Sequence, residues 1–358
     1  MRILQYHPRA AVGDGGITNS VRQLAMAFAR AGTDPIILSA DDAPPLELPG
    51  VEWRQVAHRQ IGSLAVPQDR SRGLEGADVI VLNSAWTLHN IVVGKAARAR
   101  GVPYVLAPRG AYDPRITDRK GAVKRVWWRV GERSLVEGAS AMHIFFDPER
   151  EHLQELGYTG PVIVAPNGVA VPDEPRWRGD GDHLLYLGRF DPEHKGLDLL
   201  LRALASAGDS LPVLRMHGSD WDGGKERVRQ LITELGLGDR VVIGEHLSGA
   251  QKWEAFASAI GFVYPSRWEG FGNSAAEAAA LGVPTLVTPY PLGCYLAERG
   301  GAVMAERTVP SLANALGVLT GPDAAAIGAR AAEVVRAEFT WDAVAQTWLA
   351  ALREGAIP

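Results

Sequence analysis

A regular alternation of short apolar runs with amphipathic stretches is the feature that most constrains the fold of this chain. Strands of a parallel sheet are buried on both faces, so they appear in sequence as such continuous apolar runs. The first series of predicted strands covers 3–6, 35–39, 79–82, 103–107, 141–145 and 162–164, and the second covers 183–188, 213–217, 241–243, 261–264 and 285–287. Strands that alternate with helices predict an α/β fold built on parallel sheets with helices on both faces.

A proline- and glycine-rich charged stretch at 166–181 separates the two series, and we interpret it as an interdomain linker. The 358 residues also exceed the length of a typical single domain. We therefore predict two similar Rossmann-like domains, 1–172 and 173–337. A ligand is expected between them, at the carboxyl ends of the strands.

Composition excludes several classes of protein. The formal net charge of −4 argues against a nucleic-acid-binding protein. The single cysteine, Cys294, cannot form an internal disulfide and fits a reducing cytoplasm. The N-terminal residues predict a strand and not a signal peptide, and no apolar run approaches the roughly 18 residues that a membrane-spanning helix needs. We expect a cytoplasmic protein, peripheral to the inner face of the cell membrane if it touches a membrane at all.

The loop after the first strand of the second series carries two cations, Arg189 and Lys195, and leads into a helix. Arginine offers a bidentate fork for phosphate, lysine adds a point charge, and a helix N-terminus adds a partial positive charge. Together they predict a diphosphate site. Taken alone, the loop fits equally well two solvated surface cations beside Asp191 and Glu193.

Two carboxylates, Glu269 and Glu277, bracket a glycine-containing turn that runs into an alanine-rich helix. Backbone N–H groups of 270–274 could face an anion or sugar hydroxyls. The simpler interpretation is a helix N-terminal region in which one carboxylate favours the helix dipole. The pair Gly15 and Gly16, before the first helix, allows close approach of a substrate to the backbone or forms an ordinary tight turn. It matches neither the dinucleotide-binding fingerprint nor a Walker A loop.

The order of these motifs along the chain resembles the family-4 retaining glycosyltransferases of GT-B fold. Glu269 and Glu277 correspond to the family's E-x7-E motif, and the PNGV sequence at 166–169 resembles its interdomain junction. The resemblance implies that 1–172 is an acceptor-binding domain and 173–337 a nucleotide-sugar-binding domain. It also implies that the amphipathic tail, 338–358, returns to the N-terminal domain.

The resemblance assigns roles to individual residues. Arg189 and Lys195 would hold the donor diphosphate and act as catalytic residues with Glu269, while Glu277 would bind the nucleotide ribose. No metal or other cofactor is expected, and the two cations can take a metal's place. The remaining donor-binding residues would be Gly15, Gly16, Phe271, Gly272, Asn273 and Ser274 near the sugar and phosphates, and Gly218, His246 and Leu247 near the base.

Two positions depart from the family pattern. Lys195 lies one residue farther from Arg189 than in the commonest version, which puts its direction in doubt. Many members have a histidine at the strand end where this chain has Arg109, as in a subgroup with the sequence PRG. Arg109 stays charged and cannot accept a proton, but it could steady an oxygen of acceptor or donor. Asn83, His89 and Tyr112 complete the expected acceptor-binding set, although a packed or surface histidine is an alternative for His89.

The implied reaction moves a sugar, with retention, from a nucleotide diphosphate sugar to an acceptor hydroxyl. UDP is the default nucleotide, and the acceptor is a glycan, a lipid-linked sugar or a small molecule. Attack from the face of the departing phosphate needs no protein nucleophile, and Lys195→Ala is expected to lower turnover far more than folding stability. Two alternatives are a sugar-nucleotide 2-epimerase of GT-B fold and a non-catalytic two-domain sugar-binding protein. Whether the chain is a monomer or a homodimer stays open.

The segment 115–133 is strongly basic and carries Trp127 and Trp128 on a predicted helix. A basic amphipathic helix with tryptophan can lie on an anionic membrane. In the favoured alternative, the tryptophans pack on the core and the charges are solvated.

Overall fold

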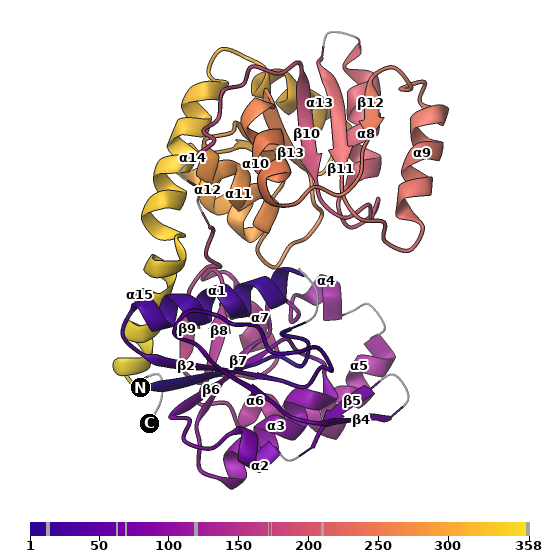
Figure 1. Ribbon diagram of the computed structural model, residues 1–358. Coiled ribbons are helices and arrows are strands. Elements are labelled where there is room, and N and C mark those ends of the chain that lie inside the picture. The colour runs from indigo at the N-terminus through magenta and orange to yellow at the C-terminus, as the bar shows by residue number, and fades with distance from the viewer. Residues whose placement is uncertain are drawn as a thin grey trace. The chain divides into compact units, whose positions relative to one another are not determined.

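The computed structural model describes residues 1–11, 15–61, 64–68, 70–117, 121–170, 172, 174–208 and 211–355 (Figure 1). The chain divides into two compact units. Unit 1 consists of Met1–Gly168 with Trp341–Pro358, and unit 2 consists of Val169–Thr340. Each unit contains its own sheet with helices packed against it, so the expected pair of α/β sheets is confirmed.

Unit 1 is built on a seven-stranded sheet of order β3-β2-β1-β6-β7-β8-β9, in which every neighbouring pair is parallel. Its strands are β1 (Arg2–Tyr6), β2 (Asp34–Ser39), β3 (Glu52–Gln55), β6 (Val79–Asn83), β7 (Tyr104–Ala107), β8 (Ala141–Ile144) and β9 (Val162–Val164). The hairpin β4 (His58–Ile61) and β5 (Leu64–Pro67) lies outside this sheet. The central strands β1, β6 and β7 are buried along almost their whole length, as their apolar runs predict.

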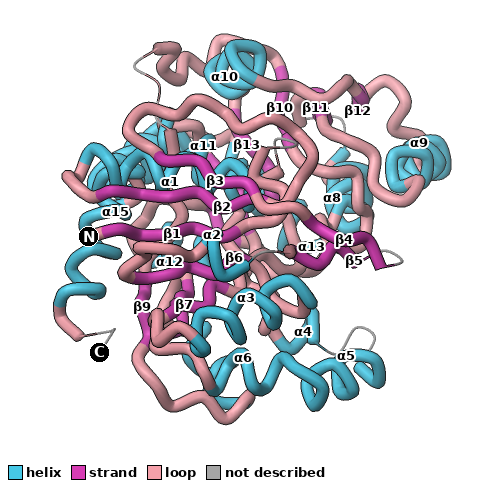
Figure 2. Tube along the Cα trace, turned by 60° about the horizontal axis from the view of Figure 1, so that its bottom comes forward, coloured by secondary structure: helices cyan, strands magenta, loops and turns pink. Residues whose placement is uncertain are grey.

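The helices of unit 1 cover both faces of the sheet (Figures 1 and 2). They are α1 (Gly16–Arg30), α2 (Arg70–Gly73), α3 (Leu88–Ala99), α4 (Pro114–Thr117), α5 (Gly121–Trp127), the π-helix η1 (Trp128–Glu132), α6 (Arg133–Glu137), α7 (Glu149–Glu155) and α15 (Trp341–Arg353). The C-terminal helix α15 packs beside α1, where Trp348 is buried and stacks on His143 with ring centroids 4.6 Å apart. The predicted return of the tail to the N-terminal unit is therefore confirmed.

Unit 2 is built on a six-stranded parallel sheet of order β12-β11-β10-β13-β14-β15. Its strands are β10 (His183–Leu187), β11 (Val213–His217), β12 (Val241–Ile243), β13 (Gly261–Tyr264), β14 (Thr285–Val287) and β15 (Val303–Met304). Its helices are α8 (Leu197–Ser206), α9 (Gly224–Glu234), α10 (Gly249–Ser258), α11 (Asn273–Leu281), α12 (Pro291–Glu298), α13 (Val309–Leu319) and α14 (Ala324–Glu338). The strand order reverses direction between β10 and β13, which makes their carboxyl ends the topological switch point of this sheet.

The expected linker is bonded to unit 2 along its second half. Trp177 donates its indole N–H to the carbonyl of Ala259 at 2.7 Å, and the backbone N–H of Arg178 donates to Ala257 at 2.8 Å. The stretch from Trp177 onward therefore belongs to the packing of unit 2. Residues 171 and 173, which fall within the expected linker, lie outside the described part of the chain. No helix among the described residues is both long enough and apolar enough to cross a membrane.

Candidate functional site

Two loops meet at the carboxyl edge of the sheet in unit 2, because β10 and β13 are parallel neighbours. The first loop follows β10 and ends at Gly196, and the second follows β13. Gly196 has a left-handed φ of 65°, and a Cβ on it would lie 2.1 Å from the carbonyl oxygen of Pro265. Glycine is therefore required at this close approach, which brings the loop that carries Lys195 against the loop that carries Glu269.

Lys195 and Glu269 form a buried ion pair. The Lys195 Nζ lies 2.5 Å from Oε1 of Glu269, and the two side chains are 7% and 10% exposed. Lys195 also donates to the Tyr264 hydroxyl at 3.0 Å, and the Ser266 hydroxyl donates to Glu269 at 2.5 Å. Burial alone would raise the pKa of Glu269, but the charge of Lys195, helped by His194 and by these hydrogen bonds, holds it below its ordinary value. The carboxylate is therefore ionised at neutral pH.

Arg189 lies at the start of the first loop and has a different environment. Its guanidinium carbon lies 4.4 Å from the ring centroid of Trp221, a cation–π contact. Within the described residues, no carboxylate lies within ion-pair distance of it. Gly218 begins the loop that carries Trp221, and a Cβ there would lie 1.8 Å from the carbonyl oxygen of Gly188. The close approach of these two backbones positions the tryptophan against the arginine.

Glu277 lies on α11 and pairs with Lys252 on α10, with Oε1 and Nζ 2.7 Å apart. The two side chains are 20% and 25% exposed. Burial raises the pKa of Glu277 above its ordinary value, and Lys252 only partly opposes this effect. Gly272, with φ of 98°, precedes the first residue of α11 and turns the chain into the helix. Glu277 is therefore held in the middle of a short helix.

The other residues that the sequence predicted to bind the donor lie in three regions: near the start of α11, in the loop after β12 and at the start of α1. Phe271 is buried with its ring centroid 6.1 Å from that of Phe339, and Asn273 and Ser274 are the first two residues of α11. His246 is exposed and Leu247 half-buried in the loop after β12. Gly15 and Gly16 lie at the start of α1 in unit 1 and are exposed, whereas residues 13 and 14 of the same loop lie outside the described residues.

Arg109 is the centre of a hydrogen-bonded group at the carboxyl edge of the sheet in unit 1. It adopts a left-handed φ of 57° and donates to Asn83 at 2.6 Å and to Asn167 at 3.0 Å. Burial lowers the pKa of Arg109 to about 10, so it stays charged at neutral pH. Asn83 is itself buried and donates to the carbonyl of Tyr6 at 3.2 Å. The strained backbone and paired side chain hold the guanidinium in one orientation.

His89 lies half-buried near the same edge, on α3. The Asn90 amide nitrogen donates to the carbonyls of Asn83 and Ser84, so its oxygen must be the group that faces His89 Nδ1 at 3.1 Å. Nδ1 therefore carries the proton, and Nε2 is the acceptor nitrogen. Burial lowers the pKa of His89 to about 4, which keeps the ring neutral near pH 7. Tyr112, the third residue expected to bind the acceptor, is buried, and its hydroxyl donates to Glu132 at 2.7 Å.

Several partners in these groups were not identified from the sequence. Ser266 lies two residues after the end of β13, so the rule that active residues gather at strand ends could have found it. Trp221 and Lys252 carry no comparable signal, because their roles depend on contacts with Arg189 and Glu277 that only the tertiary fold creates. Among the described residues, no group of three or more His, Cys, Asp or Glu side chains is arranged to hold a metal ion.

Comparison with known proteins gives matches over both units. Residues 171–317 match the family described as Glycosyl transferases group 1, and residues 15–168 match the Glycosyl transferase 4-like domain. The chain is 25% identical over 316 residues to the GDP-mannose:cellobiosyl-diphosphopolyprenol alpha-mannosyltransferase of Xanthomonas oryzae pv. oryzae, covering 84% of this chain and 80% of that protein. It is 27% identical over 388 residues to the D-inositol 3-phosphate glycosyltransferase of Segniliparus rotundus, covering 96% of this chain and 86% of that protein.

Solved structures show the same fold. Sucrose-phosphate synthase from Thermosynechococcus elongatus is similar with a TM-score of 0.79 at 20% identity, over 99% of this chain and 98% of that chain. Anabaena HepE in complex with UDP-glucose is similar with a TM-score of 0.80 at 18% identity, over 99% and 100%. With both units matched by sequence and by fold, this chain belongs to the group 1 family-4 glycosyltransferases of GT-B fold, enzymes that transfer a sugar from a nucleotide sugar.

Proposed function

We propose that this enzyme transfers a glycosyl unit from a nucleotide diphosphate sugar to an acceptor hydroxyl with retention of configuration, and that unit 2 holds the donor. One observation carries the proposal: Lys195, which pairs with the buried Glu269 of the neighbouring loop, lies in the same loop as Arg189, whose guanidinium has no carboxylate partner among the described residues. An anion of two phosphates would supply the missing countercharge.

The chemistry of the leaving group explains why these cations would be needed. Negative charge builds on the diphosphate as the anomeric bond breaks, and fixed cations in a dry site stabilise it without reorganisation. Arg189 can bind two phosphate oxygens through its planar fork. Lys195 would contribute its charge while Glu269 and Tyr264 fix its direction. Attack from the side of the departing phosphate then accounts for retention without a protein nucleophile.

Glu277 would bind the ribose hydroxyls of the nucleotide. Its carboxylate keeps one-fifth of its surface exposed and is oriented by Lys252, so its second oxygen is available to a ligand. Glu269 would face the donor sugar, and the N-terminal turn of α11 would face the phosphates. Gly15 and Gly16 of unit 1, and Gly218, His246 and Leu247 of unit 2, complete the proposed donor set.

We propose UDP as the nucleotide. The support for this choice is one structurally similar protein that was solved in complex with UDP-glucose. Another relative is named for GDP-mannose, so GDP must be tested beside UDP. The two alternatives considered from sequence, a 2-epimerase and a binding protein, are not favoured because the family is one of transferases.

Unit 1 would bind the acceptor. Arg109 is fixed in one direction by Asn83 and Asn167, and His89 presents a neutral Nε2 that can accept a hydrogen bond from an attacking hydroxyl. The hydroxyl of Tyr112 already donates to Glu132, so Tyr112 has no direct role in this proposal. Among the acceptor classes, we favour a lipid-linked sugar, because one relative is named for a diphosphopolyprenol-linked acceptor.

The test is release of nucleotide diphosphate from a panel of UDP-, GDP- and dTDP-sugars, with the anomeric configuration of any product read by NMR. The account expects release with one nucleotide class, retention in the product, and loss of both in Arg189→Ala. An inverted product would contradict the mechanism. No release and no thermal shift with any nucleotide would contradict the donor site itself.

A further inference from the structure

A continuous helical segment of unit 1, formed by α5, η1 and α6, carries a row of exposed valines. Val123, Val126 and Val130 are 65%, 62% and 76% exposed. Positions separated by three, four and seven residues lie on one stripe of a helix. These three make up a large share of the eight large apolar side chains that are exposed in the described residues, so exposed apolar surface is concentrated here. We call this stripe the valine face.

The opposite side of the segment is fixed to the core, which explains why the valines point outward. A Cβ on Gly131 would lie 2.6 Å from Cδ1 of Ile91, so the helix lies tightly against α3. Glu132 is buried and accepts hydrogen bonds from the Trp86 backbone N–H at 2.8 Å and from Tyr112. The ring of Trp128 lies 6.3 Å from that of Trp86.

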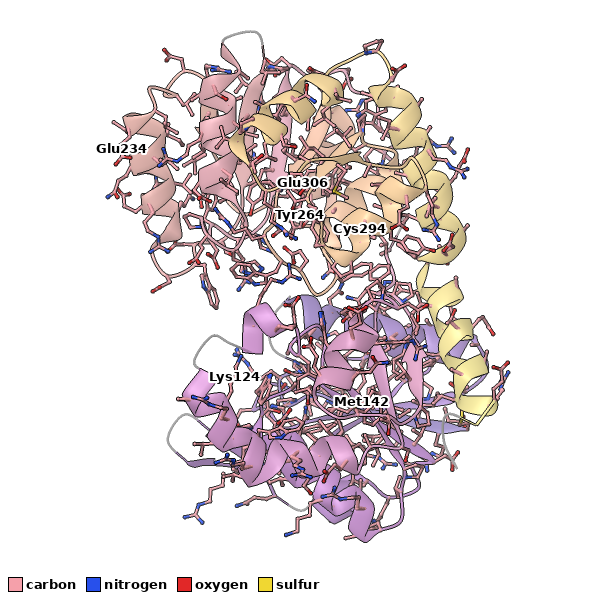
Figure 3. The ribbon with its side chains drawn as sticks, turned by 180° about the vertical axis from the view of Figure 1, so that it is seen from behind. Lys124, Met142, Glu234, Tyr264, Cys294 and Glu306 are labelled. Atoms are coloured by element: carbon pink, nitrogen blue, oxygen red, sulfur yellow. The ribbon has the colours of Figure 1, made fainter. Side chains whose placement is uncertain are left out.

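The structure therefore changes which residues a membrane would meet. The sequence placed Trp127 and Trp128 on a single helix, either as candidates for insertion or, in the favoured alternative, packed on the core. In the structure, the helix continues through a π-helical stretch, Trp127 and Trp128 are half-buried, and Trp128 packs against the core. The valine face takes the exposed position instead, and residues 118–120 of the same basic segment lie outside the described residues. Figure 3 locates the segment through the labelled Lys124.

Positive charge flanks the valine face. Arg125 and Arg129 are exposed, and neither forms an ion pair with any described residue. Arg133 pairs with Glu137 at 2.7 Å, with both side chains largely exposed. Lys124 lies over the Trp86 ring, with Nζ 5.5 Å from the centroid. Arg125 and Arg129 therefore lie beside the exposed valines with no carboxylate partner among the described residues.

Such a surface has a cost in a protein that stays in water. Valine lowers helix propensity because its branched side chain loses rotamer freedom, so an exposed helix position gains nothing from it. Single exposed apolar residues are common, but a row of them flanked by basic residues is the pattern of helices that lie in a membrane interface.

We infer that the valine face docks unit 1 on a membrane that contains anionic lipid, with the valines in the boundary between headgroups and acyl chains and Arg125 and Arg129 on lipid phosphates. Charge complementarity selects this partner, because the uncompensated guanidiniums match the negative surface of such a bilayer. Docking would bring the proposed acceptor unit to a lipid-linked sugar. That consequence rests on the proposed function, whereas the docking does not.

Flotation with vesicles of phosphatidylcholine, with and without phosphatidylglycerol, tests the inference. Wild type should float with the anionic vesicles only and be released by high salt. Arg125→Gln with Arg129→Gln should weaken binding about 30-fold, from roughly one surface charge contribution per arginine. The triple change of Val123, Val126 and Val130 to serine should weaken it at least about tenfold.

A matched control changes Val242 and Val318 to serine, because these valines are 50% and 44% exposed but lie in unit 2. The control should bind vesicles as wild type does. Equal binding to neutral and anionic vesicles, or wild-type binding by the triple variant, would overturn the inference. So would a change in molar mass of the triple variant by light scattering, which would mean that the valine face joins two copies. Nucleotide affinity, measured without vesicles, should be the same in all variants and reports separately on the donor site.

Discussion

Replacing Lys195 with alanine should destabilise unit 2 as well as slow transfer. The substitution removes an ammonium that lies 2.5 Å from the Glu269 carboxylate, where the side chains are only 7% and 10% exposed. Removing one partner of a buried ion pair leaves the other charge without compensation and costs about 3–5 kcal/mol. For a domain of this size, 1 kcal/mol shifts Tm by about 2–4 °C, so the Tm of unit 2 should fall by roughly 6–20 °C. This replaces the expectation from sequence that folding stability would fall far less than turnover.

Differential scanning calorimetry can follow this change, with unit 1 as an internal reference if the two units unfold separately. Arg202→Ala on α8 is a matched control. Arg202 is exposed, so this substitution removes a cation from the same unit and leaves the Lys195–Glu269 pair intact. The double variant Lys195→Met with Glu269→Gln should recover much of the loss, since it leaves no unpaired charge.

The pH dependence follows from the lowered pKa of Glu269. The unfolded carboxyl binds protons more readily than the folded one, so the contribution of the pair is fully present at neutral pH and is lost as pH falls through the folded pKa, below the ordinary value of 4.5. The difference in Tm between wild type and Lys195→Ala should therefore narrow in acid. A drop of less than about 2 °C at neutral pH, below 1 kcal/mol, would refute the reasoning about burial.

Three further predictions concern the two edges of the sheets. Glu277→Gln should weaken nucleotide binding about 10- to 100-fold with little change in kcat, whereas Glu269→Gln should mainly lower kcat. Calorimetric titration measures the binding and steady-state kinetics measures kcat. The reverse pattern would mean that Glu269 binds the nucleotide and Glu277 acts in transfer. Burial lowers the pKa of His194 from 6.5 to about 4, so the unfolded state takes up a proton first and wild-type stability should decline by up to about 3 kcal/mol between those pH values. His194→Asn should flatten that decline in urea titrations, and an unchanged slope would remove His194 as its cause. His89→Ala should lower kcat/KM for the acceptor about tenfold while donor affinity stays constant. An equal loss of donor affinity would mean that His89 contacts the donor and not the acceptor.

Much of the fold follows from the sequence because the central strands are buried on both faces. The strands β11, β12, β13 and β14 begin and end where their apolar runs predict. The edge strand β3, with the polar sequence EWRQ, and the two-residue strand β15 were not predicted, since neither presents a long apolar run.

The candidate site was predictable only in part. Arg189, Lys195 and Glu269 follow strand ends, which made them candidates, but their roles were assigned only through the resemblance to a family. The direct contact of Lys195 with Glu269 joins residues 74 positions apart, and it depends on how closely Gly196 approaches Pro265. A sequence pattern does not show which distant residues come into contact. It therefore predicted that Lys195 binds phosphate, and it did not predict the ion pair with Glu269. The same limit applies to the segment 121–137, where a π-helical stretch and contacts with α3 decide which side chains face outward.

The central claim is that the Arg189 loop of unit 2 binds the diphosphate of a nucleotide sugar. Calorimetric titration with UDP and UMP, and with GDP and GMP, tests it most directly in wild type and in Arg189→Ala. The account predicts that the diphosphate of one base binds more tightly than its monophosphate, and that Arg189→Ala weakens diphosphate binding about 10- to 100-fold while monophosphate binding changes little. Equal affinity for diphosphate and monophosphate, or an unchanged preference in Arg189→Ala, would contradict it.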